Sequence, residues 1–159
     1  GAKDARYVPG QLELLGGTRG GPQRKYKELE TDLTVADPAH PVVAGLEHFR
    51  IFDEFYYHLD LVQPSPRFHI LLTARIDGRD EPVCWAWDRP DGGRSFGFVG
   101  IHFHRNWRRA EYRRLVVQGI LWSLKFPVPQ GGVDVNLDPR FLELKPPARS
   151  PHQGPPRPG

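Results

Sequence analysis

The sequence predicts an α/β fold, in which helices cover the faces of a sheet. Three observations favour it: several segments have a strand-like pattern, residues 95–103 are almost wholly apolar, and residues 110–126 read as one amphipathic helix. A strand that is apolar on both faces is typical of the centre of a covered sheet. Strand–helix–strand units are few for this class, so we expect the chain to be the C-terminal part of a longer fold.

The elements of the N-terminal part are predicted from the positions of proline and glycine and from the alternation of apolar and polar residues. A short helix is predicted over residues 9–15, because Pro9 suits a first turn and two glycines follow. Residues 18–27 are rich in glycine and basic side chains, which predicts a loop. Residues 29–36 alternate apolar with polar and predict a strand, and residues 49–61 read as extended because they are rich in aromatic residues.

The later elements begin with a predicted hairpin. Residues 68–76 and 82–87 read as its strands, and Asp77-Gly78 is its turn signal. In residues 110–126 the apolar side chains recur near the helical period, and Pro127 ends the helix. Together with the apolar strand of residues 95–103, these elements make up a sheet with a strong helix after it.

Length and composition indicate one folded domain and an unstructured end. The chain has 159 residues, of which 38% are hydrophobic, enough for a core. We predict a main domain over residues 1–130, an extended segment over 131–145 and a disordered tail over 146–159, where six prolines exclude helix and sheet. The single Cys84 excludes a disulfide framework and predicts a buried, unreactive thiol.

The net charge of the chain indicates which classes of partner to expect. The net charge is +3, but the tail contributes two arginines and no acid, which leaves +1 for the rest. Nucleic acid is therefore not an expected partner. No apolar run is long enough for a membrane helix. No targeting segment is visible, so the sequence leaves a cytoplasmic and an exported location equally open.

Two histidines at the end of the apolar strand form the first candidate site. If the strand continued, His102 and His104 would lie on one face, roughly 7 Å apart. Ligands of open α/β sheets bind at the carboxyl ends of strands. Either histidine could act as a general acid or base or contact a ligand. The alternatives are a metal site, which would need a third ligand, or one packed and one exposed histidine; we predict no metal.

A second candidate begins with two adjacent acids, which are rare in strands. Alternation places Glu54, Tyr56 and His58 on one face of the strand and Asp53 on the other. The first set could line a pocket for a hydroxylated ligand. The alternative is the wet face of an edge strand.

Three further stretches carry weaker signals. Trp85 and Trp87 face the same way, which favours packing over stacking on a ligand. The Gly-rich loop around Arg19 could cradle an anion through its backbone amides. Five arginines lie in residues 105–114, where Trp107 could stack on a ligand, although a solvated basic helix face is the simpler interpretation.

Five stretches, taken in order, carry a resemblance that none carries alone. They are LLGG (14–17), ADPAHPVVAGL (36–46), DEFYY (53–57), PVCWAW (82–87) and YRRLVVQGILW (112–122). Together they resemble bacterial members of the ThuA-like (trehalose utilisation) family, in the class I glutamine amidotransferase-like superfamily. The resemblance covers about residues 8–126.

The resemblance implies a flavodoxin-like three-layer α/β sandwich, of which this chain would hold the C-terminal part with a hairpin-rich segment. It also implies that residues 100–104 lie where the amidotransferases place their catalytic histidine. Cys84 does not match the position of their nucleophilic cysteine, so glutaminase activity is not implied. What the resemblance suggests is carbohydrate metabolism.

We therefore expect a domain that acts on a sugar or an oxidised sugar without a cofactor. The residues expected to carry the chemistry are His102, His104 and Glu54, and those expected to bind the sugar are Tyr56, Arg19 and Trp107. The alternative is a non-catalytic accessory or docking domain, fused to or bound by a larger redox or sugar-processing protein.

Overall fold

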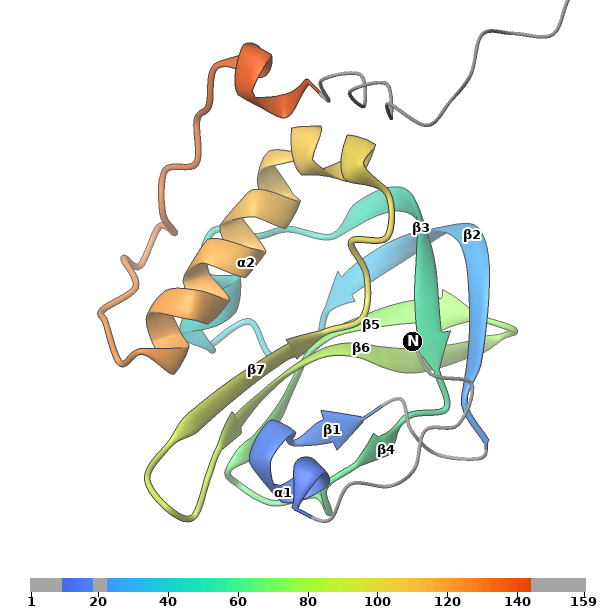
Figure 1. The fold of residues 1–159 in the computed structure, drawn as a ribbon, viewed down its shortest axis with the longest axis vertical. Coiled ribbons are helices and arrows are strands. Elements are labelled where there is room, and N and C mark those ends of the chain that lie inside the picture. Colours follow the sequence, from blue (N-terminus) through green and yellow to red (C-terminus); the bar gives the residue numbers. More distant parts are fainter. Residues whose placement is uncertain (1–9, 19–22, 144–159) are drawn as a thin grey trace, which may run out of the picture.

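An antiparallel sheet of five strands dominates the fold. The computed structural model describes residues 10–18 and 23–143. The strands lie in the order β3-β2-β5-β6-β7, and each is antiparallel to its neighbours. Figure 1 shows the curled sheet with the long helix α2 packed on one side. The strands are β2 (Lys25–Val35), β3 (Phe49–Tyr57), β5 (Phe68–Ile76), β6 (Arg79–Asp88) and β7 (Arg94–Phe98).

The predicted flavodoxin-like α/β sandwich is wrong. Parallel strands need crossover connections of about a dozen residues or more. Here β5 and β6 are joined by Asp77-Gly78 alone, and β6 and β7 by residues 89–93. Such short connections permit only antiparallel hairpins. Within the described residues there are two α-helices, α1 (Gln11–Leu15) and α2 (Ala110–Ser123).

The placement of residues 95–103 as a central strand is also wrong. β7 ends at Phe98 and lies at the edge of the sheet, where it pairs only with β6. Its apolar character on both faces has another cause. A Cβ added to Gly119 of α2 would lie 2.5 Å from the Phe96 ring, while on the other face the Ser95 hydroxyl donates to the carbonyl of Leu14 in α1. Two helices thus cover this edge strand.

Several local predictions are confirmed. The hairpin of β5 and β6 turns at Asp77 and Gly78, whose φ angles of 49° and 79° suit a tight two-residue turn. The helix predicted over residues 110–126 is α2, and the short N-terminal helix is α1. The end of the predicted loop over residues 18–27 is strand instead, because β2 already begins at Lys25.

The remaining elements are short. β1 (Gly17–Thr18) pairs with β4 (Asp60–Leu61) in a separate two-stranded sheet. Three 3-10 helices complete the described chain: η1 (Pro41–Val43), η2 (His104–Arg108) and η3 (Pro139–Leu142). The last of these lies within the segment of residues 131–145 that was predicted to be extended.

The core lies between the sheet and α2. Tyr112, Leu115 and Trp122 of α2 are buried against it. On the opposite side of β6, the Trp85 and Trp87 indoles donate to backbone carbonyls in α1, as a packing role predicts. Cys84 is buried as predicted, and burial raises the pKa of its thiol well above the ordinary value. No helix in the described ranges is long and apolar enough to cross a membrane.

Candidate functional site

The two adjacent acids of β3 lie on opposite faces of the sheet. The strand alternates as predicted, so Asp53 points into the core with 0% exposure. Glu54 lies on the outer face, where 12% of its side chain is exposed. The pleat of one strand therefore gives neighbouring carboxylates two different environments.

Asp53 holds the loop that follows β7. Its carboxylate accepts hydrogen bonds from the backbone N–H groups of Ile101 at 2.8 Å and His102 at 3.0 Å. The Tyr112 hydroxyl, from α2, donates to it at 2.8 Å. A longer bond of 3.4 Å comes from the N–H of Phe103. A buried charge is tolerated only with such partners, so this network fixes the loop on β3.

The same loop carries an unusual backbone conformation. Ile101 has a φ of 73°, in the left-handed region that a β-branched residue rarely adopts. Such a conformation costs about 1–3 kcal/mol and persists only where the surroundings enforce it. The hydrogen bond from its own N–H to Asp53 is one of the contacts that enforce it.

The loop brings His102 to Glu54. The Nδ1 atom of His102 lies 3.3 Å from Oε1 of Glu54, although the two residues come from different elements. His102 has 49% of its side chain exposed, so a ligand can reach it. A carboxylate and an imidazole in contact can exchange a proton with a bound hydroxyl. This contact brings together two residues that the sequence predicted for the site, His102 and Glu54. The sheet around them is antiparallel, so neither lies at the carboxyl end of a parallel strand, where the site was expected.

Aromatic rings lie on both sides of this contact. The rings of Tyr26 and Tyr56 are 5.8 Å apart on one side, and those of Phe52 and Phe103 are 5.5 Å apart on the other. Tyr26 and Phe52 are both exposed, so each aromatic pair offers one exposed ring beside the contact. We call this surface the outer β2–β3 face; it comprises Tyr26, Glu28, Phe52, Glu54, Tyr56, His102 and Phe103.

The register of β2 and β3 adds a further carboxylate. Glu28 is the direct cross-strand partner of Glu54. One side-chain O or N atom from each of Glu28, Glu54 and His102 lies within 4.8 Å of the others. Carboxylates and imidazole are metal ligands, so among the described residues this set could hold a divalent cation, and its chemistry also suits proton exchange without one. Reading the sequence missed Glu28, because the signal is strand pairing rather than spacing.

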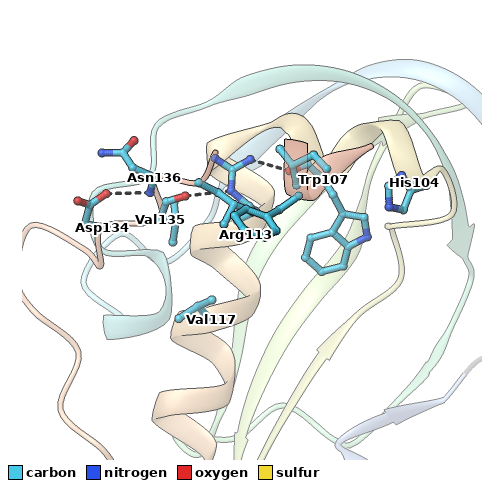
Figure 2. A pocket seen from close by; sticks show the side chains of 10 residues that line it. His104, Trp107, Arg113, Val117, Asp134, Val135 and Asn136 are labelled. Carbon is cyan, nitrogen blue, oxygen red and sulfur yellow. Dashed lines mark hydrogen bonds between the residues drawn. The ribbon is translucent and has the colours of Figure 1, made fainter. Parts of the chain in front are cut away.

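His104 and Trp107 lie at a different place. A cavity of about 490 Å³ lies between η2, α2 and the C-terminal segment of residues 134–142. Figure 2 shows His104 and Trp107 at one end of it. The Arg113 guanidinium donates to the carbonyls of Val135 and Trp107, which ties the segment to η2. The two predicted histidines therefore belong to separate surfaces. Arg19 and the proline-rich tail of residues 146–159 lie outside the described residues.

Comparison with known proteins addresses the family. The family model for trehalose utilisation, ThuA, matches residues 1–123. No curated protein matches the chain. The matched range includes β3, the loop after β7 and the whole of α2, so it contains both Asp53 and the contact of Glu54 with His102. The resemblance of the five ordered stretches is confirmed, and the chain belongs to the ThuA, trehalose utilisation, family.

Proposed function

We propose that the outer β2–β3 face binds a sugar and that Glu54 and His102 exchange a proton with one of its hydroxyl groups. Membership of the ThuA family gives the chain a role in carbohydrate metabolism related to trehalose utilisation. The observation that carries the proposal is the 3.3 Å contact of Glu54 with His102 between two aromatic pairs.

Each part of the face has a task in this proposal. The aromatic rings take the apolar C–H face of the sugar ring, and the carboxylate of Glu54 accepts a hydrogen bond from a hydroxyl. His102, in contact with that carboxylate, takes up or returns the proton. Tyr56 lies two residues after Glu54 on the same face, where its phenol can bind a second hydroxyl.

The second candidate is a non-catalytic accessory domain. The cavity at His104 and Trp107 favours it, because the walls also include apolar side chains such as Val117 and Leu137. Apolar cavities with a few polar groups are typical of binding sites in general. In that case ligand or partner binding would depend on Trp107 and not on the outer β2–β3 face. The predicted sugar contact of Arg19 remains a prediction in either case.

Calorimetric titration of the full chain with trehalose and with glucose tests the proposal. We expect Glu54→Gln and His102→Asn each to weaken binding about tenfold, the effect of losing one good hydrogen bond. Glu30→Gln is the matched control, because Glu30 lies on the same face of β2 but is paired with Arg50. Circular dichroism should show that each variant is folded.

Two results would contradict the proposal. In the first, sugar binds and neither Glu54→Gln nor His102→Asn changes the affinity. In the second, no sugar binds, or binding responds to Trp107→Ala alone, which would favour the accessory domain. Equal losses in the Glu30 control would indicate a general charge effect instead of a site.

A further inference from the structure

The outer β2–β3 face continues into a positive charge. Arg105, in η2, is exposed, and its guanidinium carbon lies 4.3 Å from the ring centroid of Phe103 and 5.3 Å from that of Phe52. These rings are the aromatic pair that flanks His102, whose own ring is 4.7 Å from Phe103. Arg105 therefore belongs to the same continuous surface as Glu54.

The stacked arginine keeps its hydrogen-bond donors available. A guanidinium is planar, so when it lies over an aromatic ring its N–H groups project from the edge and can still fork a carboxylate. Among the described residues no carboxylate forms an ion pair with Arg105. By contrast, Arg50 on the same face of the sheet is occupied by Glu30 and Asp32.

The chemical character of the outer β2–β3 face thus changes from one end to the other. Glu28 and Glu54 provide acceptors at one end, Phe52 and Phe103 provide apolar surface in the middle, and Arg105 provides donors and positive charge at the other end. A ligand complementary to this order has hydroxyl donors at one end, a ring in the middle and a negatively charged acceptor at the other end.

We propose that the site takes an anionic sugar, a sugar acid whose carboxylate is bound by Arg105. This inference rests on the proposed function, since it assigns the other end of the same ligand. Two features favour a carboxylate over a phosphate. The planar carboxylate matches the fork of the guanidinium. A phosphate would also bring nearly two negative charges toward Glu28 and Glu54, which increases the repulsion between ligand and site.

The test compares three ligands on the full chain by calorimetry at low ionic strength: glucose, glucuronate and glucose 6-phosphate. We expect the wild type to bind glucuronate about tenfold more tightly than glucose, as one charge-assisted contact at an exposed site would give. Arg105→Gln should remove this preference, so that the ratio of the glucose and glucuronate dissociation constants falls to about one. Arg105→Lys should keep only part of it, because an ammonium group is not a fork.

Arg108→Gln is the matched control. Arg108 is an exposed arginine in the same 3-10 helix, so its loss changes the net charge equally, and it should leave the preference for glucuronate intact. The increase in affinity should also fall as salt is added, because an exposed ion pair is screened.

The possible failures are distinguishable. If glucose and glucuronate bind equally well, the role of Arg105 is refuted and the sugar site stands. If neither binds, the proposed function and this inference fall together. A preference for glucuronate that survives in Arg105→Gln, or a stronger preference for glucose 6-phosphate than for glucuronate, overturns the assignment of a sugar carboxylate to Arg105.

Discussion

Replacing Asp53 by asparagine tests whether this buried carboxylate organises the site. The carboxylate accepts five hydrogen bonds from other residues: three from the loop after β7, one from Tyr112 and one from the backbone N–H of Glu54. An asparagine amide has one acceptor oxygen, and its NH2 group would face at least one backbone N–H, which can only donate, while the Tyr112 hydroxyl would lose a charged acceptor. Four of the bonds are 3.0 Å or shorter, and two of them end on each carboxylate oxygen, so two should be lost whichever oxygen the NH2 group replaces. At about 1.5–3 kcal/mol for each hydrogen bond to a charged group, the cost is about 3–6 kcal/mol.

Tyr112→Phe should lower the free energy of unfolding by a smaller amount than Asp53→Asn. It removes one donor and leaves the other bonds of Asp53 in place, so about 1.5–3 kcal/mol is expected. Urea unfolding followed by tryptophan fluorescence measures both costs. Since the two changes remove a shared contact, the double variant should cost less than the sum of the single variants.

The control and the refuting result are both available in the same experiment. Asp32→Asn changes an acid on the exposed face of β2, where its ion pair with Arg50 is worth at most about 1 kcal/mol. If Asp53→Asn costs no more than Tyr112→Phe, then the loop carrying His102 is held by other contacts. Additive costs in the double variant would likewise contradict a shared network.

Three further predictions concern the core. Burial, followed by the charge of His69, lowers the pKa of His40 to about 4. Because the unfolded chain then binds more protons than the folded one, the free energy of unfolding should rise by about 2–3 kcal/mol between pH 4 and pH 6.5 and stay level above. Urea melts measure this rise, and His40→Asn should abolish it. Gly119→Ala should lower the free energy of unfolding by about 1–3 kcal/mol, because its Cβ would lie 2.5 Å from the ring of Phe96. Gly131→Ala, with open space around its Cβ, should change the urea midpoint of unfolding little. Cys84 should react slowly with a thiol reagent in the native state and quickly in urea, since it is buried; rapid native labelling would contradict this.

Local patterns predicted what depends on local chemistry. The alternation of β3 separated Asp53 from Glu54 correctly, because the side-chain period of a strand is fixed by its pleat. The pair Asp77-Gly78 predicted its turn, because positive φ angles favour these residues. The helical period and Pro127 predicted α2 to within a few residues.

The errors come from features that need distant partners. An apolar edge strand and an apolar central strand look alike in sequence, and only the packing of α1 and α2 distinguishes β7. The place of Glu28 beside Glu54 depends on the register of β2 against β3, which the long connection between them does not specify. Likewise, His102 meets Glu54 because Asp53, far away in sequence, draws in the loop.

The neighbouring positions of Asp53 and Glu54 couple the stability of the core to the geometry of the candidate site. One peptide unit separates a carboxylate that supports the core from a carboxylate on the outer β2–β3 face, and His102 contacts both, the first through its backbone N–H and the second through its ring. Evolution cannot exchange the buried charge for a more stabilising apolar side chain without releasing the histidine. The architecture thus sets an upper limit on how far this domain can be stabilised while it keeps the contact of Glu54 with His102.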